Sequence, residues 1–195
     1  MPIQNVDNAA TMFAGYVGPA YDVGGLAFFG VNPGGGKDNS VPHSDDERFY
    51  TLLRGFRAAS PATLSTCFEA INAAFPPIVE SWNLWRIFEP ALEAFGAQLS
   101  QVCYLNAVPF RTRENKAPPK SARDTAWLKC TAPVLVVLRP RTWVALGKAA
   151  GDILATAEGS EKPGEFYVVP RTNGDRYLSP EAKQVLQSIR YQRGT

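Results

Sequence analysis

The sequence predicts an α/β fold: a three-layer α/β/α sandwich around a central, mostly parallel, four-stranded sheet. Four short apolar segments are each followed by Pro or Gly, which is typical of buried strands that end in tight loops. Segments with helical spacing of apolar residues lie between them, and this alternation favours parallel pairing. The 195 residues, 45% of them hydrophobic, are enough for one core, so we expect a single domain over residues 1–195.

The first predicted strand covers residues 26–31 (LAFFGV) and leads into the loop NPGGG. The other three cover residues 101–108 (QVCYLNAV), 142–146 (TWVAL) and 165–169 (EFYVV). In folds of this class, ligands bind beyond the carboxyl ends of the strands. The loops after these four strands are therefore the candidate site: residues 32–37, 109–115, 147–148 and 170–176.

Helices are predicted where apolar residues recur three and four positions apart. Three such stripes consist of Phe49, Leu52, Leu53 and Phe56, of Leu64, Phe68, Ile71 and Phe75, and of Trp85, Phe88, Leu92 and Phe95. A last helix is indicated by Ser179 as its cap, Pro180 at its first position and an inner face of Val185, Leu186 and Ile189. Residues 121–138 form either one helix disturbed at Pro133 or a helix and a strand, and we favour the helix.

Composition excludes several classes of protein. The 20 Lys and Arg against 18 Asp and Glu give a net charge of +2, which excludes a polybasic tail or an acidic disordered chain. Residues 1–100 carry −5 and residues 101–195 carry +7, so the second half can supply a positive face for a polyanion, although solvated charges are the commoner meaning.

Three widely spaced cysteines and the single His43 predict no metal site and no disulfide framework. The apolar runs are shorter than the ~18 residues of a membrane span, and the first residues lack the pattern of a secretory signal. We therefore expect a cytoplasmic protein with reduced thiols.

The segment GVNPGGGK has the glycines of a phosphate-binding loop, but Val31 and Asp38 stand where that loop needs Gly and Ser or Thr. The longer segment FFGVNPGGG instead resembles the first motif of the uracil-DNA glycosylase superfamily. It is most similar to the branches with Asn at the position of Asn32, the mismatch-specific uracil or thymine glycosylases and the single-strand-selective uracil glycosylases.

Further segments resemble that superfamily in the same order along the chain. They are ERFYTLLRGF, VCYLNAVPFRTREN, TWVALGKAA and VVPRTNGDRYLSPEAKQVL, so the resemblance covers roughly residues 24–190. It implies a uracil-DNA glycosylase-like domain and a monofunctional hydrolase of base-excision repair. Such an enzyme flips out and excises uracil or another deaminated base by water attack on the N-glycosidic bond. It needs no metal or organic cofactor, and we expect a monomer whose partner is DNA containing a damaged or mismatched base.

The resemblance also implies roles for individual residues. Asn32 would place the attacking water, and because an amide is not basic it would orient the water rather than deprotonate it. Asn106 would read the base, and Arg171 stands near the position of the usual histidine, where it can stabilise the leaving anion or bind a DNA phosphate. Further expected base contacts are Val31, Pro33, Gly34 and His43. Expected DNA contacts are Gly35, Gly36, Lys37, Arg111, Arg113, Lys148, Thr172, Asn173, Gly174, Arg176 and Tyr177.

Several alternatives remain open at this stage. Relatives have a stacking Phe near the position of residues 41–43, so either His43 stacks on the base or Phe49 or Tyr50 takes that role, although Phe49 and Tyr50 are more often core residues. Asn106 distinguishes uracil from cytosine only if a partner fixes its amide, and the sequence does not show that partner. The loop after the last predicted strand, residues 171–174, differs from the pattern of the superfamily. The sequence is therefore also compatible with two other functions: a catalytically impaired nucleic-acid-binding module on the same fold, or an enzyme acting on nucleosides or nucleotides.

Overall fold

A five-stranded mixed sheet forms the centre of the molecule in the computed structural model, which describes residues 12–33, 44–82, 84–110, 118–156, 165–171 and 178–194. Its strands are β1 (Tyr16–Val17), β2 (Leu26–Gly30), β3 (Val102–Asn106), β4 (Thr142–Leu146) and β5 (Glu165–Val169), in the spatial order β1-β3-β2-β4-β5. Strands β3, β2, β4 and β5 are parallel, and β1 pairs antiparallel with β3. All four predicted strands are therefore confirmed.

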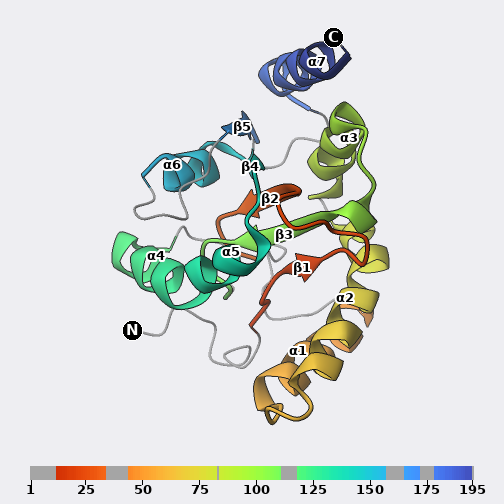
Figure 1. Ribbon diagram of the computed structural model, residues 1–195, viewed down its shortest axis with the longest axis vertical. Helices are drawn as coiled ribbons and strands as arrows, with labels where there is room; N and C mark the ends of the chain where they lie inside the picture. The colour runs from red at the N-terminus through yellow and green to blue at the C-terminus, as the bar shows by residue number, and fades with distance from the viewer. Residues whose placement is uncertain are drawn as a thin grey trace.

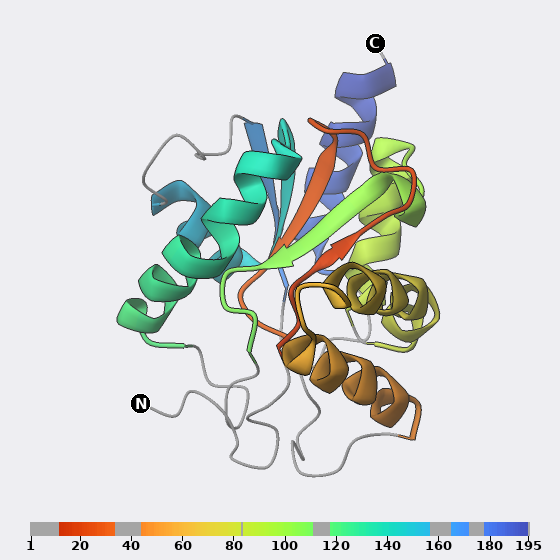
Figure 2. The same ribbon diagram turned by 60° about the horizontal axis from the view of Figure 1, so that its bottom comes forward.

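Helices cover both faces of this sheet (Figures 1 and 2). One face carries α1 (Ser44–Ala58), α2 (Leu64–Ser81), α3 (Trp85–Phe95) and α7 (Pro180–Gly194). The other carries α4 (Lys120–Ala126), the π-helical segment η4 (Trp127–Thr131), α5 (Ala132–Leu138) and α6 (Lys148–Thr156). The single turn η2 (Leu99–Gln101) leads into β3. None of the helices in these described ranges is long and apolar enough to cross a membrane.

The sheet has one strand more than the four that the sequence predicts. Strand β1 is only two residues long, which is too short to produce a recognisable alternation of apolar and polar residues. It is held by pairing of Tyr16 with Tyr104, and the Val17 amide donates to Asn72 Oδ1 of α2 at 2.8 Å. The residues that make these contacts are far apart in the sequence, so the pattern of apolar residues around β1 does not indicate them.

The four predicted helices are present, and residues 120–138 are helical throughout. Helix α2 continues past Pro76 and Pro77 because Ile78 and Val79 are buried against the core. The π-helical segment comes just before Pro133, whose nitrogen has no hydrogen to donate to the preceding turn. Helix α6 was not predicted; it follows β4 directly after Gly147, whose φ of 102° turns the chain sharply.

The two sheet faces bury different side chains. On the face of α1, α2, α3 and α7, aromatic rings surround Tyr104, and we call Phe13, Tyr16, Phe75, Phe88 and Tyr104 the aromatic core. Its ring centroids lie 4.7 to 5.9 Å apart, in stacked, tilted and edge-to-face arrangements. The opposite face buries Phe29, Trp127 and Trp143, among others. The aromatic core reaches the carboxyl end of the sheet, where the loops predicted to carry function begin.

The cap of the last helix provides a test of this fold. The Ala182 amide donates to Ser179 Oγ at 3.1 Å, so Ser179→Ala should lower the free energy of unfolding by about 1 kcal/mol in urea denaturation. Ser188→Ala is the matched control, because Ser188 Oγ only donates back to Val185 O within the same helix. Equal effects of the two substitutions would contradict the assigned cap.

Candidate functional site

The ends of the parallel strands bring several of the predicted site residues to one edge of the sheet, the carboxyl edge. Gly30 pairs with Asn106, and Leu146 pairs with Val169, while β2 pairs with β4 in the register of Phe29 with Ala145. One row across the sheet is therefore Asn106, Gly30, Leu146 and Val169. Asn32, Lys148 and Arg171 each come two residues after the end of β2, β4 or β5, and Gly147 turns the chain before Lys148. Because side chains alternate along strands, Asn106 and Gly30 lie on the face of the aromatic core, like Tyr104 and Phe28.

Asn106 is the central polar group of this edge. Its side chain is 6% exposed, and the Tyr104 hydroxyl donates to its Oδ1 at 3.0 Å. Its Nδ2 is buried and has no hydrogen-bond partner among the described residues. Its backbone oxygen accepts from Thr131 Oγ1 at 3.3 Å. A buried amide whose oxygen has a hydrogen-bond partner and whose nitrogen has none lowers the stability of the folded protein. Such groups are candidates for ligand binding.

The amide lies across β2 because residue 30 is glycine. A Cβ at Gly30 would come within 2.6 Å of Asn106 Oδ1 and 3.0 Å of the Tyr104 hydroxyl oxygen. Real Cβ atoms do not come that close to their neighbours, so any larger residue would have to push the amide away. Gly30 therefore makes room for the Asn106 side chain over the carboxyl end of β2.

Tyr104 holds this amide from within the aromatic core. Its ring lies between Phe13, Phe75 and Phe88, at centroid distances of 5.9, 5.9 and 5.7 Å. Burial raises the pKa of Tyr104 to about 12, while the positive charge of Arg171 acts to lower it. The hydroxyl is therefore protonated at neutral pH and available as a donor.

Arg171 and Lys148 bring positive charge to the carboxyl edge. Arg171 follows β5 and is exposed, and a methyl group on Gly147 would lie 3.5 Å from its Cβ. Lys148 is the first residue of α6 and is also exposed. The charge of Arg171 is near enough to act on the Tyr104 hydroxyl. The structure thus brings Arg171 to the same region as Asn106 and Tyr104.

The chain after β2 runs beside the chain after β3. The amides of Ala107 and Val108 donate to the carbonyls of Gly30 and Val31, each at 2.9 Å, so the parallel pairing continues beyond the strands. Asn32 is half-buried, and its Nδ2 donates weakly to Pro33 O at 3.4 Å. The expected water-placing Asn32 and the expected base-reading Asn106 therefore belong to adjacent strands.

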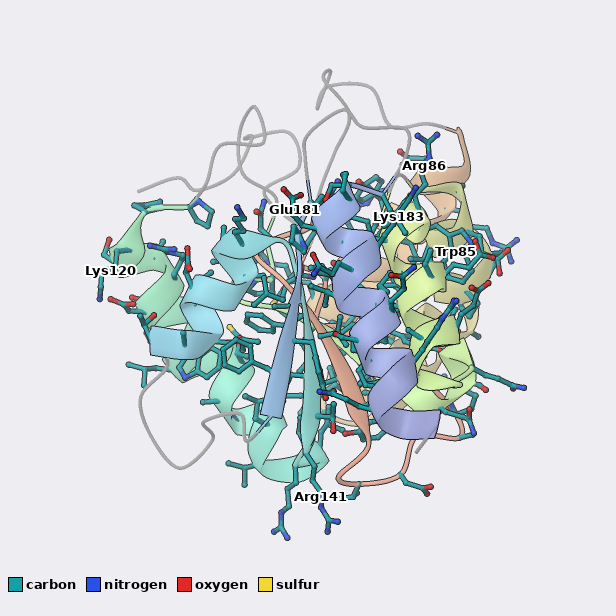
Figure 3. All side chains as sticks on the ribbon, turned by 90° about the horizontal axis from the view of Figure 1, so that it is seen from above. Trp85, Arg86, Lys120, Arg141, Glu181 and Lys183 are labelled. Atoms are coloured by element: carbon teal, nitrogen blue, oxygen red, sulfur yellow. The ribbon has the colours of Figure 1, made fainter. Side chains whose placement is uncertain are left out.

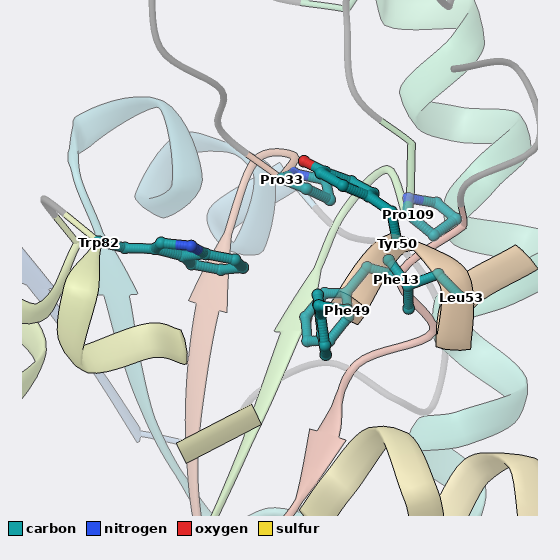
Figure 4. Close-up of a pocket in the computed structure, with 7 residues that line it drawn as sticks. All are labelled: Phe13, Pro33, Phe49, Tyr50, Leu53, Trp82 and Pro109. Carbon is teal, nitrogen blue, oxygen red and sulfur yellow. The ribbon is translucent and has the colours of Figure 1, made fainter. Parts of the chain in front are cut away.

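An apolar hollow adjoins these strand ends (Figure 4). It is small and partly open to solvent, and it is lined by Phe13, Pro33, Phe49, Tyr50, Leu53, Trp82 and Pro109. Phe49 and Tyr50 are 2% and 3% exposed, so both are core residues that also form the wall of this hollow. Of the expected base contacts, Pro33 lines the hollow, and Val31 packs against the opposite face of the sheet.

Other predicted site residues lie outside the described part of the chain. They are Gly34, Gly35, Gly36, Lys37, His43, Arg111, Arg113, Thr172, Asn173, Gly174, Arg176 and Tyr177. Their expected contacts with base and DNA remain predictions. Lys120, the first residue of α4, forms an exposed ion pair with Asp124 at 2.8 Å.

Sequence reasoning missed Tyr104, Gly30 and Thr131. Tyr104 precedes Asn106 by two residues in a strand, so both lie on one face, and this spacing was a usable signal. Gly30 and Thr131 come from other elements, and only the tertiary structure brings them to Asn106. Trp82 and Phe13 also line the hollow without any local pattern that predicts it.

Comparison with known proteins assigns no family, because the sequence matches no protein-family model and no curated protein. The described ranges hold no group of three or more His, Cys, Asp or Glu residues positioned for a metal ion.

The close contact at Gly30 yields a second prediction. Gly30→Ala should lower the free energy of unfolding by about 1–3 kcal/mol in urea denaturation, because the new methyl group overlaps Asn106 Oδ1. Gly55→Ala in α1 is the control: nothing lies within 4 Å of its Cβ position, so it should stabilise the protein by about 0.5–1 kcal/mol. If both substitutions stabilised the protein, the amide would not lie over Gly30 as described.

Proposed function

We propose that this protein is a DNA glycosylase that excises uracil or another deaminated base by hydrolysis of the N-glycosidic bond. The observation that carries the proposal is the Asn106 carboxamide, a buried group whose Nδ2 donor has no partner among the described residues. The resemblance to the uracil-DNA glycosylase superfamily assigns base reading to this same residue. A flipped base with a ring carbonyl would supply the missing acceptor, once local movement uncovers Nδ2.

The neighbouring groups support the same chemistry. In the proposed reaction, a water molecule bonds to the sugar carbon C1′ while the bond from C1′ to the base nitrogen breaks. Both electrons of that bond leave with the base, and the water proton passes to the departing base or to solvent. Asn32, beside the β3 chain, would orient the water through its amide, which is too weak a base to take the proton.

Arg171 would stabilise the negative charge that develops on the departing base. Its guanidinium always carries a positive charge and offers several donors, and it acts on Tyr104, the partner of Asn106. A positive charge beside the departing base lowers the energy of an anionic leaving group. Arg171 would thus take the part that a histidine has in the superfamily.

Cleavage of the base from labelled oligonucleotides tests the proposal. Single- and double-stranded substrates would carry uracil, hypoxanthine, xanthine or a thymine mismatch, with abasic product measured after alkaline cleavage. Asn32→Ala should reduce kcat/KM about 100-fold through misplacement of the water, and Asn106→Ala about 10- to 100-fold through loss of its hydrogen bonds. Full activity of Asn32→Ala would contradict its assigned role.

Arg171→Ala should reduce kcat at least about tenfold, since a charge-assisted contact to the leaving group is lost. Arg141→Ala is the matched control, because Arg141 is exposed at the amino end of the sheet, opposite the end where Lys183 and Arg86 lie (Figure 3). Its kcat should equal that of the wild type. If salt-dependent DNA binding occurred with no product from any base, the protein would be a binding module on this fold instead.

A further inference from the structure

We propose that the solvent-facing side of η4 and α5 is a docking surface for an acidic amphipathic helix of a partner protein. This inference does not depend on the proposed function, because none of the residues that carry it belongs to the candidate site. Three observations support it. Large apolar side chains are exposed on one side of these helices, cations surround them, and one of these cations has a backbone conformation that is unusual for its residue type.

One side of η4 and α5 faces the sheet, and the other side faces solvent. Trp127, Thr131 and Leu135, spaced four residues apart, are buried. Large apolar residues on the other side of these helices and in the turn before β2 are instead between 52% and 70% exposed, and we call them the outer patch: Val23, Leu128, Val136 and Val137. Exposed apolar side chains gathered in one place are typical of surfaces that bind a partner.

The outer patch is a narrow stripe. Its helical part extends about 15 Å along the helix axis at 1.5 Å per residue, with the exposed Pro133 between its ends. Val23 adjoins the last turn of α5, because the Gly24 amide donates to Leu138 O at 3.0 Å. A stripe of this shape matches the apolar face of one amphipathic helix packed alongside.

Exposed cations surround the outer patch. None of them forms an ion pair with another described residue, and they are Lys129, Arg139 and Arg141. Of the acidic residues near the patch in the sequence, Asp22 is exposed, and Asp124 already pairs with Lys120. The cations therefore outnumber the acids that could neutralise them. An apolar stripe with a positive rim is complementary to a helix that has acidic residues beside its apolar face.

Two of these cations have defined places beside the patch. Arg139 ends α5 with a φ of 46°, a left-handed conformation in which glycine is the usual residue. Its Nε donates to Val136 O at 3.1 Å, which keeps the guanidinium next to the patch. The Arg141 side chain crosses Gly24, where a Cβ would lie 3.3 Å from its Nε, so it lies beside the turn that carries Val23. Strained backbone at a non-glycine residue is concentrated at functional positions.

The same features disfavour other occupants. A second copy of this chain would bring one positive rim against another. A nucleic acid would be attracted by the cations, but its phosphates gain nothing from exposed Leu and Val side chains. The outer patch contains no Trp, Tyr or Phe, the residues that commonly anchor proteins at a lipid surface. An acidic amphipathic helix uses both the apolar stripe and its positive rim.

The test measures binding of designed peptides to the full chain by fluorescence anisotropy. The acidic peptide has about 18 residues, enough to form a helix, with Leu at helical spacing on one face and Glu beside that face. A second peptide has Lys in place of Glu, and a third has Ser in place of Leu. Val137→Asp puts a negative charge into the outer patch. Leu64→Asp is the matched control, because Leu64 is an exposed apolar residue at the start of α2, on the other face of the sheet.

We expect the acidic peptide to bind wild type and Leu64→Asp at least about tenfold more tightly than either other peptide, and Val137→Asp to lose about tenfold of that affinity. Because Val137 is exposed, Val137→Asp should keep the circular dichroism spectrum of the wild type.

Equal binding of the acidic and basic peptides, or equal losses in the two variants, would overturn the inference. Absence of binding to all three peptides would also overturn it. In that case, binding to phosphatidylserine vesicles that Val137→Asp abolishes would assign the outer patch to a lipid surface, and self-association that Val137→Asp abolishes in sedimentation would assign it to a second copy. No readout involves base excision, so this inference and the proposed function fail separately.

Discussion

The site depends on one constraint, the placement of a carboxamide at the boundary between an aromatic core and the end of a parallel sheet. Asn106 is buried, so each of its polar atoms needs a partner or carries a free-energy cost. Tyr104 satisfies the oxygen, Thr131 satisfies the backbone carbonyl, and Gly30 leaves the space in which the amide lies. Asn106 Nδ2 has no hydrogen-bond partner among the described residues, and stability of the fold gives no reason for such a group.

Parallel strand pairing converts four separate sequence segments into one surface. Because β3, β2, β4 and β5 all end at the same edge, Asn106, Asn32, Lys148 and Arg171 lie along that edge although they are far apart in the chain. The aromatic core on one face then fixes Tyr104, while the helices on the other face supply Thr131. The same packing that stabilises the sheet therefore also positions the polar groups.

The sequence was sufficient for the elements whose stability is local. Four apolar strands and the helices with clear apolar stripes lie where their patterns predict, since burial of those stripes is what forms them. Strand β1 was missed because two residues carry no periodic pattern, and Tyr104 was missed although its two-residue spacing from Asn106 puts both side chains on one face of β3. Asn106 itself was found by resemblance, whereas the space for its amide is left by Gly30 of the neighbouring strand, which only the tertiary structure shows.

The most direct test of this account is a crystal structure of Asn32→Ala with an oligonucleotide that carries 2′-fluoro-2′-deoxyuridine, whose glycosidic bond resists cleavage. We expect a flipped uracil at the carboxyl edge, with O4 within hydrogen-bond distance of Asn106 Nδ2. A bound oligonucleotide whose uracil stays stacked in the strand, or whose base contacts neither Asn106 nor Arg171, would contradict it.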